Sequence, residues 1–140
     1  MAIDSTSQTL KVLLVEDDPG DILLTKKALQ DCPCEVCVVT DGVQALDFLK
    51  QATSYPDLLL MDLNLPKLDG KQLLSTVKTD PSLAEIPIVV LTTSDRDDDI
   101  QRMTALGADS YVTKPIEVNA YLETVRSIAE SWLTADTENE

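Results

Sequence analysis

The chain has 140 residues, 44% of them hydrophobic and 26% charged, which is typical of one globular domain and not of a disordered chain. A formal net charge of −14 argues against nucleic acid as a direct partner, and the absence of histidine excludes histidine-based catalysis and most zinc or iron sites. The apolar runs are too short to cross a membrane and Met1–Leu10 does not resemble a signal peptide, which favours a cytoplasmic protein without a membrane partner.

Short apolar runs alternate with helical patterns along the chain. Strands are predicted at 11–15, 35–40, 57–62, 88–91 and 111–113. Helices are predicted from 19 to about 30, across 45–52, across 73–77, from 97 to 106 and from 118 to 133. Asp18 followed by Pro19 is a typical helix start, and Gly107 is a typical residue after a helix end.

The predicted strands are almost continuously apolar, as are parallel strands that helices cover on both faces. Right-handed crossovers then favour a doubly wound α/β fold, with a five-stranded parallel sheet in the flavodoxin-like order 2-1-3-4-5 and five helices. We expect a single domain over residues 1–140, with a core at about 10–130 and loose termini at 1–9 and 134–140.

The three cysteines, Cys32, Cys34 and Cys37, lie close together in the sequence. They have no fourth soft ligand nearby, whereas structural zinc usually takes four ligands. We therefore expect reduced thiols, and the sequence assigns them no role.

Charged and hydroxyl side chains follow four of the predicted strands. Glu16 and Asp17 follow the first strand, Asp62 the third, Thr92 the fourth and Lys114 the fifth. In the order 2-1-3-4-5 these strands are neighbours, so the groups converge on one pocket at the carboxyl ends of the strands, where open α/β sheets bind ligands.

Carboxylates that share a pocket repel one another and need a neutralising cation. Magnesium prefers carboxylate and carbonyl oxygens, which Asp17, Asp62 and the main-chain carbonyl of Asn64 can supply. Lys114 and Thr92 can bind an anion beside that ion. A carboxylate, a metal ion and a lysine together favour phosphoryl transfer to an aspartate, in which positioning and charge neutralisation dominate.

With these motifs the chain resembles a response-regulator receiver domain of two-component signalling, and the likeness covers about residues 10–130. The segments that carry it are Val15–Asp18, Met61–Pro66 with Asp69–Gly70, Leu91–Thr93 and Tyr111–Pro115.

The resemblance implies that Asp62 accepts a phosphoryl group from a histidine kinase, in a reaction that depends on Mg²⁺ or, in its place, Mn²⁺. It implies that Asp17, Asp62 and the Asn64 carbonyl bind the metal, and that Glu16 contacts it through water. It also implies that Lys114 pairs with the phosphoryl oxygens, next to a cis Lys114–Pro115 bond.

The resemblance further implies a two-state switch. Thr92 would move toward the phosphoryl group and Tyr111 would turn inward, changing the face made by the fourth helix, the fifth strand and the last helix. Thr93 departs from the family pattern, because a smaller residue is frequent there, and the difference affects access to the pocket.

A second set of segments is similar to the small stand-alone regulators paired with bacterial, especially cyanobacterial, phytochromes, whose kinases sense red and far-red light. These segments are Glu16–Asp21, Asp62–Lys67, Thr92–Ser94 and Trp132–Leu133. Such regulators are commonly homodimers.

The last helix has a wide apolar stripe that is relevant to dimerisation. Its inward residues are predicted to be Val118, Leu122, Val125 and Ala129. Tyr121, Ile128 and Trp132 extend the stripe to one side, where they either contact a second copy or, in the case of Trp132, fold back on the same domain.

Two other functions are less consistent with the sequence than a signalling phosphoacceptor is. A phosphohydrolase of the haloacid-dehalogenase type needs an acid two residues after its aspartyl nucleophile, and that position is Asn64. A nucleotide- or flavin-binding domain needs a glycine-rich phosphate loop, and Gly20 stands alone. Because no DNA-binding unit is expected after Leu133, signalling through protein contacts is favoured over enzymatic or direct transcriptional activity.

Overall fold

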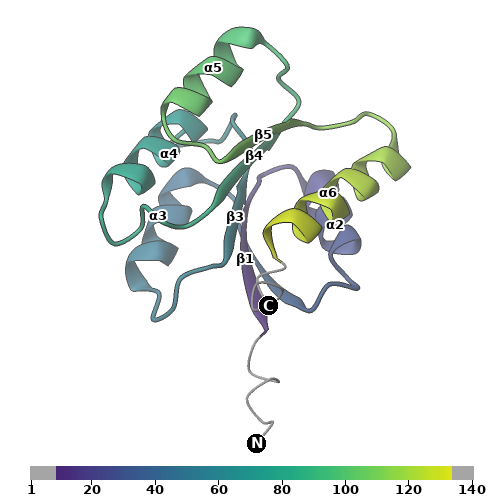
Figure 1. The fold of residues 1–140 in the computed structure, drawn as a ribbon, viewed down its shortest axis with the longest axis horizontal. Helices are drawn as coiled ribbons and strands as arrows, with labels where there is room; N and C mark the ends of the chain where they lie inside the picture. Colours follow the sequence, from purple (N-terminus) through teal and green to yellow (C-terminus); the bar gives the residue numbers. More distant parts are fainter. Residues whose placement is uncertain (1–8, 134–140) are drawn as a thin grey trace, which may run out of the picture.

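Five parallel strands run through the middle of the protein, with helices on both sides (Figure 1). This computed structural model describes residues 9–133. The strands are β1 (Leu10–Val15), β2 (Cys34–Val39), β3 (Leu58–Met61), β4 (Ile88–Thr92) and β5 (Ser110–Thr113). Their order across the sheet is β2-β1-β3-β4-β5, which confirms the predicted doubly wound, flavodoxin-like α/β fold.

The register places the carboxyl ends of neighbouring strands side by side. Val15, the last residue of β1, is aligned with Val39 of β2 and with Met61 of β3. On the other side of β3, Met61 is aligned with Val90 of β4. The residues that follow β1 and β3 therefore emerge together at one edge of the sheet.

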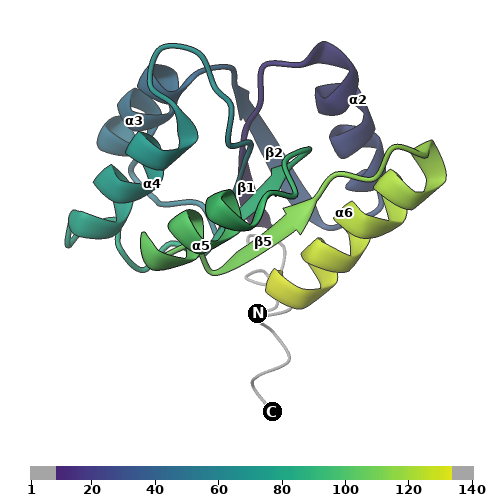
Figure 2. The ribbon, with the colours of Figure 1, turned by 90° about the horizontal axis from the view of Figure 1, so that it is seen from above.

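The five predicted helices are present, and they divide between the two faces of the sheet (Figure 2). They are α2 (Pro19–Ala28), α3 (Gly42–Gln51), α4 (Gly70–Thr79), α5 (Asp97–Ala105) and α6 (Val118–Trp132). Alternate residues of β1 point to opposite faces, so Leu13 packs with α3, α4 and α5 and Leu14 packs with α2 and α6. Each face buries its own apolar cluster, and that burial holds the helices on the sheet.

Local signals fix where the helices begin and end. The Asp18 side chain caps α2 by accepting hydrogen bonds from the backbone N–H groups of Gly20 at 2.8 Å and Asp21 at 3.2 Å. Gly107 has φ of +110°, a conformation that favours glycine, and it stops the chain from continuing α5. Both features agree with the sequence predictions.

A close approach of two backbones positions the loop that follows β3. A Cβ added at Gly42, the first residue of α3, would clash with the carbonyl oxygen of Leu68. Only glycine therefore allows the loop between β3 and α4 to pack against the start of α3. This contact fixes the chain just after the carboxyl end of β3.

The last helix differs from the prediction in which of its residues are buried. Tyr121 and Ile128 are 3% and 6% exposed within their own domain, and Trp132 packs partly against the same core cluster. Most of the surface of these side chains is therefore covered within one copy of the protein, so they do not form the wide exposed apolar stripe that the sequence predicted. The Tyr121 hydroxyl lies 3.1 Å from Thr25 Oγ1 of α2, a polar partner that makes its burial possible. Val118, predicted to point inward, is 52% exposed at the start of α6.

Within residues 9–133, no helix has the length and apolar character needed to span a bilayer. The predicted loose termini, apart from Thr9, lie outside the described residues.

Candidate functional site

Three charged residues follow three strands of the sheet and are fixed by its hydrogen-bond pattern. The N–H group of Glu16 donates to Val39 O at 3.0 Å, and that of Asp62 donates to Val15 O at 3.1 Å. The N–H group of Lys114 donates to the carbonyl oxygen at the end of β4, at 2.7 Å. Because each backbone is held one residue beyond its strand, the side chains leave from fixed positions at the carboxyl edge of the sheet.

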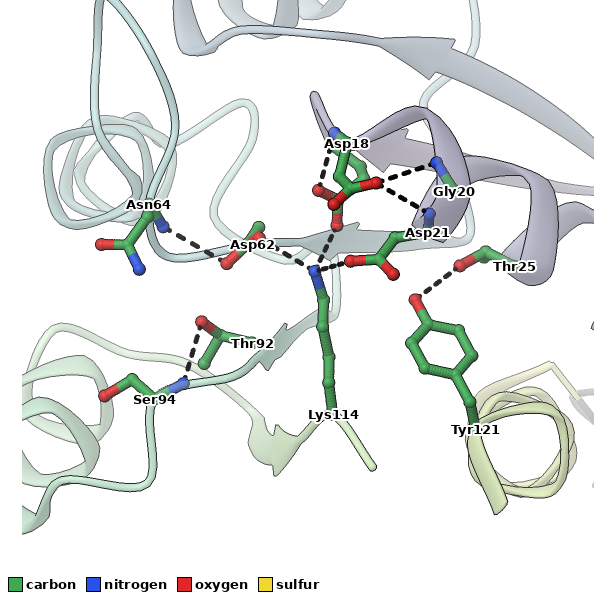
Figure 3. Close-up of polar contacts among 11 residues, drawn as sticks. Asp18, Gly20, Asp21, Thr25, Asp62, Asn64, Thr92, Ser94, Lys114 and Tyr121 are labelled. Atoms are coloured by element: carbon green, nitrogen blue, oxygen red, sulfur yellow. Dashed lines mark hydrogen bonds and ion pairs between the residues drawn. The ribbon is translucent and has the colours of Figure 1, made fainter. Parts of the chain in front are cut away.

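The Lys114 ammonium group is the centre of the cluster (Figure 3). Its Nζ atom donates hydrogen bonds to Glu16 Oε1 at 2.7 Å, to Asp21 Oδ2 at 2.7 Å and to Asp62 Oδ2 at 3.0 Å. Burial alone lowers the pKa of Lys114, but its bonds with Asp21 and Glu16 and the charge of Asp62 raise that pKa above its usual value. The lysine is therefore held in its charged form.

Glu16 is a buried carboxylate, with 3% of the residue exposed. Burial raises the pKa of Glu16, while the ion pair with Lys114 acts in the opposite direction. Its second oxygen, Oε2, accepts the N–H of Asp18 at 3.1 Å. A carboxylate with both oxygens bound and so little exposure is fixed in place.

Asp62 is held but remains accessible. One oxygen, Oδ2, accepts from Lys114, and the other, Oδ1, accepts the backbone N–H of Asn64 at 3.3 Å. Its side chain is 12% exposed, compared with 3% for Glu16. Of Glu16 and Asp62, Asp62 is therefore the carboxylate more open to a reactant.

Asp21 is the site residue that sequence reasoning missed. The helix predicted from residue 19 to about 30 has Asp21 in its first turn, where an acidic side chain interacts favourably with the helix dipole. In the structure that turn begins directly above the carboxyl edge of the sheet, and Asp21 reaches Lys114. The available signal was the short distance in sequence between the end of β1 and Asp21.

Thr92 and Tyr111 lie beside the cluster. Thr92 is completely buried, and its Oγ1 accepts the N–H of Ser94 at 3.4 Å. The Tyr111 hydroxyl donates to the Ser94 carbonyl oxygen at 2.8 Å, and burial is the main cause that raises the pKa of Tyr111. Both side chains therefore hold the loop between β4 and α5, while Thr93 is exposed.

One expectation at the site was wrong. No peptide bond in residues 9–133 is cis, so Lys114–Pro115 is trans. The trans form is the intrinsically preferred one, by about 0.5–1 kcal/mol before proline. Lys114 reaches its carboxylate partners with this bond trans.

The donor set of the cluster fits a hard divalent cation. No three acidic or cysteine side chains in the described residues are arranged to hold a metal ion as they stand, because the Lys114 ammonium lies among the carboxylates. The carboxylates of Glu16, Asp21 and Asp62 nevertheless share one ammonium, and Asp17 follows Glu16 in the sequence, which leaves an excess of negative charge at this edge of the sheet. Oxygen donors with excess negative charge are the ligands that Mg²⁺ and Mn²⁺ take.

Comparison with known proteins identifies the family. Residues 12–126 match the response regulator receiver domain. The chain belongs to the response-regulator receiver family. This family acts in signalling as a phosphoacceptor and is not a class of conventional enzymes.

Two cyanobacterial response regulators, one of them a phytochrome response regulator, are among the similar proteins. Response regulator Rcp1 of Synechocystis is 36% identical to this receiver over 141 residues, covering 96% of each chain. The solved phosphorylated cyanobacterial phytochrome response regulator RcpA is 42% identical with a TM-score of 0.87, over 91% of this receiver and 96% of that chain. The Mn²⁺-bound form of Rcp1 is 36% identical with a TM-score of 0.85, over 89% of this receiver and 95% of that chain.

Proposed function

We propose that this receiver is a single-domain response regulator that accepts a phosphoryl group on Asp62 from a sensor histidine kinase. The observation that carries the proposal is the convergence of Glu16, Asp62 and Lys114 at the carboxyl ends of β1, β3 and β5. Asp62 is more accessible than Glu16, and its Oδ2 atom lies 3.0 Å from Lys114 Nζ.

The transfer exchanges one bond to phosphorus for another. An oxygen of Asp62 attacks the phosphorus, a P–O bond forms, and the P–N bond to the kinase's phosphohistidine breaks with its electron pair on the nitrogen, which then takes up a proton. Lys114 donates to a phosphoryl oxygen and offsets its charge. The Asn64 N–H, which now binds Asp62 Oδ1, holds the aspartate in the orientation for attack.

Asp17, Asp62 and the main-chain carbonyl of Asn64 would hold Mg²⁺ or Mn²⁺, with Glu16 contacting it through water. When bound, the ion would neutralise charge on the transferred group. Support comes from the excess of carboxylates around one ammonium and from the Mn²⁺-bound form of Rcp1. Thr92 would then contact the phosphoryl group, and Tyr111 would move with the loop that it now holds through Ser94.

Phosphorylation is proposed to change the face formed by α5, β5 and α6. This face would bind protein partners in the cytoplasm, and it would bind neither nucleic acid nor membrane. Its homodimer contact would use a hollow of about 430 Å³ on this face. The hollow is lined by Val112, Ala120, Glu123, Thr124, Ser127 and Ile128. In sedimentation, Thr124→Arg is then expected to convert a dimer to a monomer, and Trp132→Glu to leave the dimer intact.

The kinase is proposed to be a phytochrome-type light sensor, since the similar RcpA and Rcp1 are cyanobacterial regulators and RcpA is a phytochrome response regulator. Phosphotransfer from a red-light-sensing kinase is expected to be faster than from a kinase of another sensory class. Equal rates from both kinases would contradict this assignment and leave the phosphoacceptor role intact.

The phosphoacceptor role is tested with Mg²⁺ and acetyl phosphate, and then with an active histidine kinase. Wild type is expected to form an acid-stable, base-labile phosphoryl adduct that Asp62→Asn does not form. No adduct on wild type, with a donor active on another receiver, would overturn the proposal.

A further inference from the structure

The ammonium group of Lys114 has all its hydrogens in use. Its Nζ atom bonds Glu16, Asp21 and Asp62 at 2.7, 2.7 and 3.0 Å (Figure 3). A lysine ammonium has three donors and no acceptor. A phosphoryl oxygen on Asp62 can therefore bind Lys114 only if it replaces one of these carboxylates.

The three carboxylates differ in how easily Lys114 can leave them. Glu16 is buried and has a second hydrogen bond that fixes it, while Asp62 is the group that carries the phosphoryl group. Asp21 has 24% of its side chain exposed, and within residues 9–133 its carboxylate accepts a hydrogen bond from Lys114 alone. Water can replace Lys114 at Asp21 at a lower cost than at a dry carboxylate.

We propose that Asp21 is a positioning residue that holds Lys114 in the unphosphorylated protein and competes with the phosphoryl group for it. The inference rests on the proposed function of Asp62. The negative charge of Asp21 also opposes an incoming phosphoryl group of the same sign. Asp21 thus restrains phosphorylation until its bond to Lys114 is exchanged.

The loss of the bond between Asp21 and Lys114 is expected to affect a second contact of α2. Thr25 lies one turn after Asp21 on the same face of the helix, and its Oγ1 is 3.1 Å from the Tyr121 hydroxyl of α6. Release of Asp21 from Lys114 is therefore expected to change the environment of Thr25 and of the contact between α2 and α6.

The test measures binding of beryllium trifluoride, a phosphoryl stand-in, at saturating Mg²⁺. Asp21→Asn keeps the shape and removes the charge, and it is expected to bind the stand-in about tenfold more tightly than wild type, the lower end of what a hydrogen bond to a charged group contributes. Asp21→Glu keeps a carboxylate and is expected to restore binding close to that of wild type. Asp98→Asn removes the same charge from α5 and is expected to change binding by less than about twofold.

Amide NMR spectra give the readout that a merely structural role would not move. In the absence of the stand-in, Asp21→Asn is expected to shift the Thr25 signal part-way toward its position in the wild-type complex. If Asp21→Asn binds the stand-in no more tightly than wild type or Asp98→Asn does, the inference about Asp21 is overturned. Phosphorylation of the wild type at Asp62 would still support the proposed function in that case. A wild type that takes up neither the stand-in nor a phosphoryl group would overturn both.

Discussion

Replacement of Lys114 by methionine tests the electrostatic account of the site. Methionine keeps an apolar chain in place of the lysine stem and removes the ammonium that Glu16, Asp21 and Asp62 share. The Glu16 and Lys114 side chains are 3% and 4% exposed, and removal of one partner of a buried ion pair costs about 3–5 kcal/mol. The bonds to Asp21 and Asp62, whose side chains are 24% and 12% exposed, contribute less than the dry Glu16 pair because water partly screens them. We expect a loss of about 3 kcal/mol in the free energy of unfolding at pH 7.

The pH dependence separates charge from packing. Burial already raises the pKa of Glu16, and loss of Lys114 raises it further. In the variant, Glu16 then has a higher pKa in the folded state than in the unfolded state. The variant therefore keeps its stability below the pKa of unfolded Glu16 and loses it as pH rises through the pKa of folded Glu16. The loss caused by Lys114→Met is therefore expected to be less than half as large at pH 5 as at pH 7.

Urea unfolding of wild type, Lys114→Met and the control Lys26→Met measures these differences. Lys26 is an exposed lysine of α2, so its replacement changes the net charge equally without touching the site. A loss below about 1 kcal/mol at pH 7 would refute the reasoning. So would an equal loss at both pH values, which would assign the effect to packing of the lysine stem.

Three further predictions address the fold around the site. Gly42→Ala is expected to cost about 3 kcal/mol in urea unfolding, because its Cβ would meet the backbone of the loop after β3. A Cβ at Gly20 would meet only the Asp18 side chain, at 3.3 Å, so Gly20→Ala should change stability by less than about 1 kcal/mol. Similar effects of the two substitutions would contradict this reasoning. Burial raises the pKa of Tyr121 to about 12, so the wild type should lose stability as pH rises from 10 to 12. Tyr121→Phe should reduce the free energy of unfolding by about 1–2 kcal/mol at pH 7, and its stability should fall less steeply than that of wild type between pH 10 and 12. Parallel pH profiles of the two proteins would contradict this prediction. Burial and the neighbouring Cys32 thiol raise the pKa of Cys34 to about 12. Iodoacetamide at pH 8 should therefore modify the exposed Cys37 before Cys34, as followed by peptide mass spectra. Equal rates of modification at Cys34 and Cys37 would disprove this prediction.

The sequence predicted the sheet and the convergence of charges for the same reason. Continuous apolar runs indicate parallel strands, and a charged residue follows the first, third and fifth runs, so the sequence alone places Glu16, Asp62 and Lys114 at one edge of the sheet. The structure brings these three together.

The parts that the sequence could not predict depend on how helices sit against the sheet. Asp21 reaches Lys114 only because the first turn of α2 lies over the carboxyl edge, a placement that helical periodicity does not encode. The sequence likewise predicted a wide apolar stripe on α6, but not which part of the protein covers it. Tyr121 is buried because Thr25 of α2 meets its hydroxyl, a contact between residues 96 positions apart.

The central claim is that Asp62 is the residue that accepts the phosphoryl group, and reductive trapping tests it most directly. The chain is phosphorylated with Mg²⁺ and acetyl phosphate and then treated with borohydride, which reduces an aspartyl phosphate to an alcohol. Peptide mass spectra are expected to place the reduced residue at position 62 and to show none in Asp62→Asn. Reduction at Glu16 or Asp17 in wild type, or an equal yield in Asp62→Asn, would contradict the account.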